Sequence, residues 1–313
     1  MSMKFSVVFP GQGSQSVAML ADLAEAFPVV QETFQEASDA LGFDLWGMTQ
    51  NGPVEALNLT HNTQPAMLAA GISVWRIWGE QGGPQPALMA GHSLGEYSAL
   101  VAADSLGFSD AIKLVAERGR LMQEAVPEGV GAMAAILGLD DDKVCELCTE
   151  AAESEVVEAV NFNSPGQVVV AGNKSAVDRM VILAKSAGAK RALPLPVSVP
   201  SHCALMQPAA EKLAAYLADV EIKASSIPVI HNVTVAETSN ADDIRGLLAQ
   251  QLYSPVRWVE TVQRMAEDKT ECIIEAGPGK VLAGLCKRID RAVNGLAVFD
   301  PASLEKAMER VNA

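Results

Sequence analysis

The stretch Gly91-His92-Ser93-Leu94-Gly95 decides how the rest of the chain is interpreted. It fits the pattern G-x-S-x-G, in which a serine lies on a sharp turn between a strand and a helix. The apolar run 87–90 predicts the end of a buried strand, and good helix formers follow through Ala103. Glycine is needed where a side chain would block so tight a turn. These features predict that Ser93 is a nucleophile, whereas the simpler interpretation is a serine that caps a helix.

Two backbone amides can be placed around this turn. Leu94 begins the predicted helix, where an N–H stabilises a developing oxyanion. A second glycine-rich turn, Pro10-Gly11-Gln12-Gly13, follows a predicted strand over residues 4–9. It matches neither the dinucleotide fingerprint, which would need a glycine or alanine where Ser16 stands, nor the Walker pattern. The turn is therefore either an ordinary connection or the source of a second oxyanion donor.

The composition is that of a large globular protein with an acidic surface. The 313 residues are 49% hydrophobic and 19% charged, and 23 Lys and Arg against 38 Asp and Glu give a net charge of −15. This balance argues against general nucleic-acid binding and against binding to anionic membranes. No apolar run reaches membrane-spanning length and no secretory signal is visible, so we expect a cytoplasmic protein.

The cysteines predict no metal site. Five cysteines in a long chain are interpreted as reduced thiols. Cys145 and Cys148 form a lone C-x-x-C on a helix predicted over 140–150, and metal binding would need a second pair. We therefore interpret both as thiols that face the core.

Arg118 interrupts an apolar stripe on the helix predicted from Ser109 to about Ala125. The stripe consists of Leu114, Val115, Leu121, Met122 and Ala125. A buried guanidinium carries a large desolvation cost unless an anion partners it. The pattern slightly favours an internal Asp or Glu as that partner. The alternative is a substrate carboxylate, which the planar fork of arginine matches.

Strands alternate with helices through most of the chain, which predicts an α/β fold with a mostly parallel sheet covered on both faces. Between residues 129 and 198 the order β-α-β-β-α-β is that of a ferredoxin-like unit. We therefore predict a large subdomain, 1–128 and 199–313, and a small subdomain, 129–198, that forms one wall of a cleft. More locally, we expect a helix over 65–79 and strands over 191–198 and 229–235.

A nucleophilic serine needs a base, and histidine is the default. Four histidines are present. His92 adjoins the serine but points elsewhere, as neighbours on a strand do. His61 precedes a helix, and His231 lies in a predicted strand as a core histidine. His202, at the junction of the small subdomain with a new helix, is the best candidate by elimination. No convincing acid partner for it is visible.

Six separated motifs, in this order, resemble the malonyl-CoA:acyl carrier protein transacylases, the acyltransferases of bacterial type II fatty acid synthesis. The motifs are Phe9-Pro10-Gly11-Gln12-Gly13-Ser14-Gln15, Gly91-His92-Ser93-Leu94-Gly95-Glu96-Tyr97, Arg118-Gly119, Asn161-Phe162-Asn163-Ser164-Pro165-Gly166-Gln167, Ser201-His202 and Gly277-Pro278-Gly279-Lys280. The resemblance covers nearly the whole chain. It implies an α/β-hydrolase-like core that carries the ferredoxin-like insert.

The resemblance also implies roles for individual residues. Ser93 would be the nucleophile and His202 its general base. Arg118 would bind the malonyl carboxylate, and the backbone carbonyl of Gln251 would orient the histidine where hydrolases use an acid. The implied oxyanion donors are the N–H groups of Gln12 and Leu94. The implied pocket positions are Gln64, Asn161, Asn163 and Ser201.

The implied reaction moves a malonyl group from malonyl-CoA, a substrate, to the phosphopantetheine thiol of acyl carrier protein, without a cofactor or a metal. Carrier proteins are typically acidic, so docking needs a local basic patch. We assign this basic patch to Lys190, Arg191, Lys280, Lys287 and Arg288, and expect a monomer. Two alternatives are a serine hydrolase, which gives no reason for Arg118, and a non-catalytic carrier-binding subunit, which gives none for Ser93 and His202.

Overall fold

The computed structural model describes residues 3–197 and 199–313, which form two sheets. The larger is a five-stranded sheet in the order β7-β2-β1-β8-β9, and every neighbouring pair in it is parallel. Its strands are β1 (Phe5–Phe9), β2 (Leu88–Gly91), β7 (Val229–Ile230), β8 (Cys272–Ala276) and β9 (Asn294–Val298). Every residue of β1, β2 and β8 is buried, as expected where helices cover both faces. The predicted parallel sheet is therefore confirmed.

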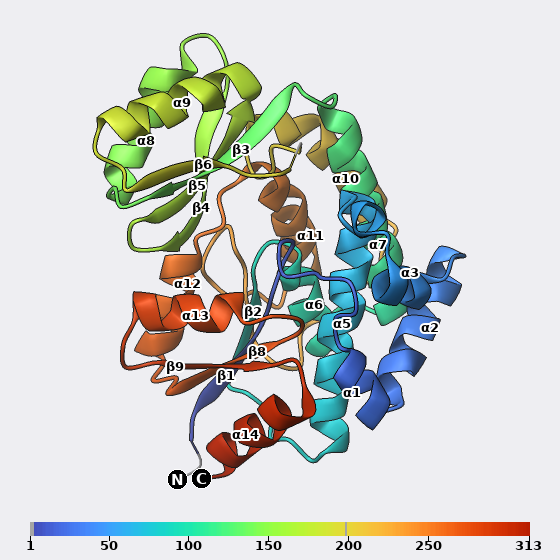
Figure 1. Ribbon diagram of the computed structural model, residues 1–313. Helices are drawn as coiled ribbons and strands as arrows, with labels where there is room; N and C mark the ends of the chain where they lie inside the picture. The colour runs from blue at the N-terminus through green and yellow to red at the C-terminus, as the bar shows by residue number, and fades with distance from the viewer. Residues whose placement is uncertain (1–2, 198) are drawn as a thin grey trace.

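Helices cover the two faces of this sheet (Figure 1). The helices are α1 (Ala21–Ala26), α2 (Val29–Leu41), α3 (Leu45–Asn51), α4 (Val54–Leu57), α5 (Thr60–Glu80), α6 (Gly95–Ala102), α7 (Phe108–Ala125), α10 (Gln207–Leu217), α11 (Ala241–Gln250), α12 (Trp258–Glu267), α13 (Val281–Ile289) and α14 (Pro301–Asn312), with short 3-10 turns over Ala204–Met206 and Gln251–Tyr253. Alternate side chains of β1 enter different clusters. Val7 and Phe9 pack in the cluster that contains α2, α5 and α7, whereas Val8 packs with α12 and α13.

The smaller sheet has four strands in the order β4-β5-β3-β6, with antiparallel pairs. Its elements are β3 (Gly131–Leu137), α8 (Asp141–Ala152), β4 (Val157–Ser164), β5 (Gln167–Asn173), α9 (Lys174–Ser186) and β6 (Arg191–Pro194). This order confirms the ferredoxin-like unit. The two helices lie together over its outer face (Figure 1). The division of the chain at residues 129 and 198 stays a prediction, and Ser198 lies outside the described residues.

Several local predictions were wrong in their bounds. Helix α5 begins at Thr60, five residues before the expected start, with Pro65 inside it. The missing N–H of Pro65 removes one helical bond, but the surrounding turn is buried against α7, and packing outweighs the loss. Strand β6 ends at Pro194, and the last residue of the strand expected over 191–198 lies outside the described residues.

Strand β7 and one cysteine also differ from expectation. Only Val229 and Ile230 form β7, because the backbone turns back at once: the N–H of His231 donates to the carbonyl of Ala236. Cys145 is exposed, so the prediction that it faces the core is wrong, whereas Cys148 is buried as expected.

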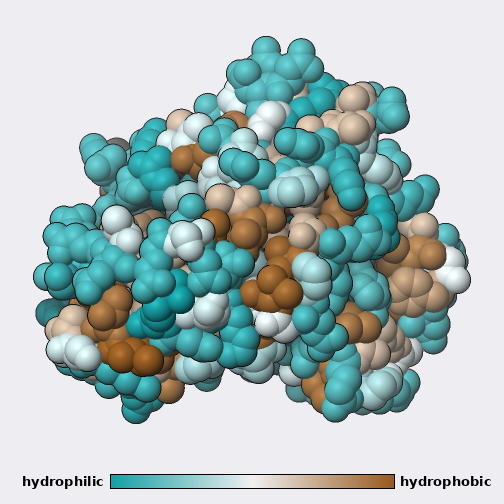
Figure 2. Space-filling view, turned by 90° about the horizontal axis from the view of Figure 1, so that it is seen from above, coloured by the Kyte–Doolittle hydropathy of each residue, from teal (hydrophilic) through white to brown (hydrophobic). Residues whose placement is uncertain are grey.

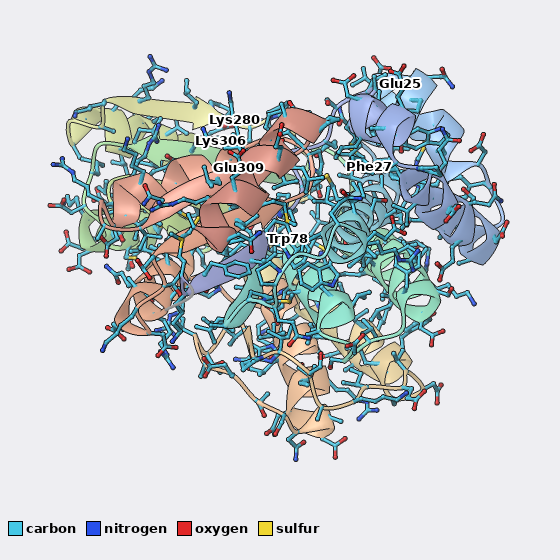
Figure 3. All side chains as sticks on the ribbon, turned by 90° about the horizontal axis from the view of Figure 1, so that it is seen from below. Glu25, Phe27, Trp78, Lys280, Lys306 and Glu309 are labelled. Atoms are coloured by element: carbon cyan, nitrogen blue, oxygen red, sulfur yellow. The ribbon has the colours of Figure 1, made fainter. Side chains whose placement is uncertain are left out.

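Apolar side chains pack at the lower end of the molecule, beneath a mostly hydrophilic surface. At the lower end, Trp78 of α5 packs its ring against Phe5 of β1, with ring centroids 5.9 Å apart (Figure 3). Seen from above, hydrophilic residues cover most of the surface and apolar residues gather in separate patches (Figure 2). Among the helices of residues 3–197 and 199–313, none is both long enough and apolar enough to span a bilayer.

Candidate active site

The site is built on the turn between β2 and α6, which two glycines make possible. A Cβ at Gly91 would lie 1.8 Å from the carbonyl carbon of Gly95, and a Cβ at Gly95 would lie 2.0 Å from the carbonyl oxygen of Phe9. Both positions therefore exclude any side chain. The close packing lets α6 begin directly over the carboxyl ends of β1 and β2 and leaves Ser93 at the tip of the turn.

Ser93 and His202, which are 109 residues apart in the chain, are in direct contact. The distance from Ser93 Oγ to His202 Nε2 is 2.8 Å. The other ring nitrogen, Nδ1, lies 2.8 Å from the main-chain oxygen of Gln251. A carbonyl oxygen only accepts, so Nδ1 carries the proton and Nε2 is free to accept the serine proton. The pair therefore has the geometry of a nucleophile and its general base.

His202 is held in its neutral form. Its side chain is buried, and this burial, followed by the positive charge of Arg118, lowers the pKa of the imidazole to about 3. A base that is unprotonated at every pH near neutrality is ready to accept the proton of Ser93.

The backbone at both residues is in the left-handed region, with φ of 51° at Ser93 and 69° at His202. Residues with a Cβ occupy this region at a cost, so surrounding bonds must hold them there. The N–H of Ser93 donates to Asn232 Oδ1 at 2.8 Å, and the N–H of His202 donates to the Leu252 carbonyl at 2.9 Å. The strained backbone aims both side chains at the same point.

Arg118 lies beside this pair and lacks the internal salt bridge that the pattern slightly favoured. It is 1% exposed, yet no Asp or Glu oxygen in the described part of the chain lies within 4.0 Å of its guanidinium. Its amino groups donate instead to Gln64 Oε1 at 2.8 Å, Gln251 Oε1 at 2.9 Å and Ser93 Oγ at 3.3 Å. Its Nε has no partner among the described residues. The Nε–H is therefore a buried donor without an acceptor among the described residues.

Gly119 on α7 lets Arg118 reach the site, because glycine has no side chain. A Cβ at Gly119 would lie 2.6 Å from the Cα of His61, so only glycine permits this approach of α7 to the start of α5. The approach brings Arg118 against Gln64 on α5. Tyr97 of α6 lies under the guanidinium, 5.4 Å from ring centroid to Cζ, and adds a cation–π contact.

The two predicted oxyanion amides lie on adjoining turns. Leu94 precedes the first residue of α6, and its N–H is not bonded to any acceptor in residues 3–197 and 199–313. The turn after β1 packs against the same elbow, because a Cβ at Gly11 would lie 2.4 Å from the carbonyl oxygen of His92. Gln12 follows in that turn. The Leu94 amide therefore adjoins Ser93, and Gln12 follows a residue that packs on the elbow.

The remaining predicted pocket residues are not in the Ser93–His202–Arg118 cluster. Asn163 Oδ1 lies 2.8 Å from His92 Nε2, so this asparagine ties the small sheet to the elbow, and His92 points away from the serine as expected. Asn161 is buried in β4 beside Val256. Ser201 precedes His202, and its side chain makes no hydrogen bond within the described residues.

Two buried polar residues of the site, Glu96 and Asn232, were not predicted from the sequence, and both lie beside His231. Asn232 accepts from the Ser93 N–H and donates to the Gly91 carbonyl. Glu96 accepts from His231 Nδ1 at 2.8 Å, which confirms His231 as a core residue. The available signal was His-Asn directly after a buried parallel strand, because the carboxyl ends of such strands line the functional edge of the sheet.

A serine on a strand–turn–helix elbow, a neutral histidine in contact with it and a buried arginine beside both form the arrangement of an enzyme of the acyl-transfer class. The sequence model of the acyl transferase domain matches residues 6–298, and the chain belongs to this family.

Relatives in this family carry a more specific name. The chain is 58% identical over 306 residues to the malonyl CoA-acyl carrier protein transacylase of Escherichia coli K12, covering 98% of this chain and 99% of that one. A malonyl CoA-acyl carrier protein transacylase from Coxiella burnetii has a TM-score of 0.99 at 50% identity, covering 100% and 99% of the two chains. A malonyl-transacylase solved in complex with its type II polyketide acyl-carrier protein has a TM-score of 0.97 at 58% identity, covering 98% and 99%.

Proposed function

We propose that this protein transfers the malonyl group of malonyl-CoA to the phosphopantetheine thiol of an acyl carrier protein through a malonyl-Ser93 ester, and so supplies fatty acid elongation in the cytoplasm. One observation carries the substrate assignment: Arg118 is buried next to Ser93, and among the described residues no carboxylate contacts its guanidinium directly and its Nε has no partner. An acyl group that ends in a carboxylate supplies the missing anion. The names and high identities of the relatives support the same reaction.

In the first half-reaction Ser93 Oγ attacks the thioester carbonyl while its proton passes to His202 Nε2. The tetrahedral oxyanion lies against the N–H groups of Gln12 and Leu94. The carbon–sulfur bond then breaks, and His202 returns the proton to the sulfur of CoA. In the second half-reaction the pantetheine thiol gives its proton to His202 and attacks the ester, and Ser93 leaves with that proton. No cofactor or metal takes part.

The other residues position these groups. The Gln251 carbonyl fixes the tautomer of His202 in place of a triad acid. Gln64 and the Gln251 side chain hold two amino groups of Arg118 and so orient its unpartnered Nε–H. We assign Asn161 and Asn163 to the wall that the small subdomain contributes to the pocket, and Ser201 to the pocket beside His202.

The substrate assignment is tested by acylation with radiolabelled malonyl-CoA and acetyl-CoA. We expect the label to appear first on the protein and then on added carrier protein. With Arg118→Gln we expect malonyl acylation to fall about 10²-fold or more, because the carboxylate loses a charge-assisted bidentate partner. Acetyl acylation should not fall.

Two outcomes would contradict the proposal. Rapid release of free malonate would indicate a hydrolase. Equal losses for the malonyl and the acetyl group in Arg118→Gln would show that Arg118 does not read the carboxylate.

We further propose that the protein acts as a monomer and that the basic patch receives the carrier protein. Arg288 of α13 donates to Gln167 Oε1 at 3.0 Å, and Gln167 pairs with Leu137, which pairs in turn with Arg191. Arg191 and Arg288 therefore flank one end of the small sheet. This end is near the elbow, because Gln167 also pairs with Ser164, the neighbour of Asn163. Lys280 lies at the start of α13 (Figure 3).

Reversing two charges of the patch is expected to weaken transfer to carrier protein. With Lys287→Glu and Arg288→Glu together, the ratio of carrier transfer to acylation by malonyl-CoA should fall about tenfold at low salt, and less at high salt because the charges are screened. The control is the same charge change at Lys143 and Lys185, which are exposed on α8 and α9. If both double variants lower the ratio equally, the basic patch does not receive the carrier protein.

A further inference from the structure

The reaction described above leaves one buried carboxylate unused. Glu96 on α6 is 1% exposed and accepts three hydrogen bonds. The donors are His231 Nδ1 at 2.8 Å, the Asn232 N–H at 2.9 Å and Gln251 Nε2 at 2.8 Å. An ionised carboxylate, which only accepts hydrogen bonds, matches this set of donors. Burial of that charge calls for a counter-charge nearby.

The amide of Gln251 lies between this carboxylate and the guanidinium of Arg118. Its Oε1 accepts from Arg118 at 2.9 Å, and its Nε2 donates to Glu96 at 2.8 Å. The amide dipole is thus aligned with both charges, oxygen toward the cation and nitrogen toward the anion. In the described part of the chain, no Lys or Arg nitrogen lies within 4.0 Å of Glu96 and no carboxylate oxygen lies within 4.0 Å of Arg118. Gln251 thus joins a buried cation to a buried carboxylate through its amide.

We propose that Glu96 is the internal counter-charge of Arg118, held one amide away by Gln251, and that this spacing sets the selectivity of the enzyme for acyl groups that end in a carboxylate. The inference rests on the proposed function, in which Arg118 binds the malonyl carboxylate. A carboxylate in direct contact with Arg118 would occupy the Nε–H that the substrate needs. A carboxylate one amide away balances the buried charge and leaves that N–H without a partner.

The charge of Glu96 acts in opposite directions on the stability of the fold and on malonyl binding. Glu96 stabilises the folded protein because it offsets the buried charge of Arg118. It also repels the malonyl carboxylate, which shares the same low-dielectric region. Removing the charge of Glu96 should therefore make the protein less stable and malonyl binding tighter. Substitution of a residue that merely shapes the pocket would lower the stability and also weaken malonyl binding.

Glu96→Gln isolates the charge, because the hydrogen bonds can be kept. The amide oxygen can accept from Asn232 and Gln251, and the amide nitrogen can donate to His231 once the ring takes its other tautomer. The change of tautomer costs no hydrogen bond, because His231 Nε2 has no partner among the described residues.

The binding test uses Ser93→Ala protein, which cannot be acylated, with and without Glu96→Gln. Calorimetry at pH 8 measures the Kd of malonyl-CoA and of acetyl-CoA. We expect Glu96→Gln to lower the Kd of malonyl-CoA about tenfold and to leave that of acetyl-CoA unchanged. The control is Glu275→Gln, another buried carboxylate, which bonds the Ala283 N–H at the start of α13. Burial raises the pKa of Glu275 to about 7, so at pH 8 its carboxyl is charged, and we expect no change in either Kd.

The stability test is a double-mutant cycle on chemical unfolding. Glu96→Gln should destabilise the protein when Arg118 is present and should have little effect in the Arg118→Gln protein, because no buried charge is then left alone. If Glu96→Gln alone yields no folded protein, the double variant Glu96→Gln/Arg118→Gln should restore folding.

The outcomes separate this inference from the proposed function. Weaker or unchanged malonyl-CoA binding in Glu96→Gln, equal changes for the two ligands, or additive losses of stability would overturn the inference. If Glu96→Gln alone does not fold, failure of Glu96→Gln/Arg118→Gln to restore folding would overturn the inference as well. A malonyl preference that persists in Arg118→Gln would instead refute the carboxylate-binding role on which the inference rests.

Discussion

Replacement of Ser93 by alanine is expected to lower the rate of malonyl transfer by about 10⁴-fold or more. The substitution removes the oxygen that carries the acyl group between the two thiols, so no covalent intermediate can form. Initial rates of transfer to carrier protein measure the loss, and mass spectrometry after incubation with malonyl-CoA should find no malonyl adduct.

The fold should survive this change. The bonds that shape the elbow are made by the backbone N–H of Ser93 with Asn232 and by the glycines around it, and all of these remain in the alanine variant. The midpoint of thermal unfolding therefore serves as the control. A variant that keeps its fold and still transfers malonyl groups through a protein adduct would show that the nucleophile is another residue.

Replacement of His202 by alanine is expected to lower the rates of both half-reactions by about 10³-fold or more, because the same imidazole takes and returns each proton.

In the wild-type protein the acid limb of the pH profile of kcat/KM should lie far below the ordinary pKa of histidine. Burial and the nearby charge of Arg118 lower the pKa of His202 to about 3, so kcat/KM for acylation should stay flat from pH 8 to pH 5. An acid limb centred near pH 6.5 would contradict this environment for the base.

The same pKa shift makes stability depend on pH. The unfolded chain binds a proton at His202 below about pH 6.5, whereas the folded protein does not until about pH 3. The free energy of unfolding is therefore lost as the pH falls, by about 2 kcal/mol between pH 6.5 and 5 from this residue alone. Denaturant unfolding at the two pH values measures the loss. The His202→Ala protein should lose that much less over the same interval.

Most of the fold could be predicted because its signals are local. The buried runs of β1 and β8, the turn at Gly91 to Gly95 and the βαββαβ order are all visible in short windows of sequence. The failures occurred where distant contacts override such signals. Thr60 to Gln64 are polar but helical, because α7 covers them, and the apolar run after Pro228 ends as a strand at Ile230, because the chain turns to contact α6.

The site divides in the same way. Ser93 and the glycines around it follow from one pentapeptide, and the misfit of Arg118 in its stripe follows from helical periodicity. His202 was reached by elimination and Gln251 through a family resemblance, because neither has a local pattern. Glu96 lay inside a quoted motif, but nothing in the sequence indicates that a residue three positions after the serine turns inward to meet His231 and Gln251.

The sequence by itself indicated the kind of chemistry, since a glycine-bounded serine between a strand and a helix is the pattern that holds a nucleophilic hydroxyl on a sharp turn. Only the tertiary structure decided what surrounds it. The pattern slightly favoured an internal carboxylate as the direct partner of Arg118, but the fold places amides there and sets Glu96 behind Gln251. Periodicity shows that a charge is buried, whereas its partner depends on which distant segments meet it, and that is a property of packing alone.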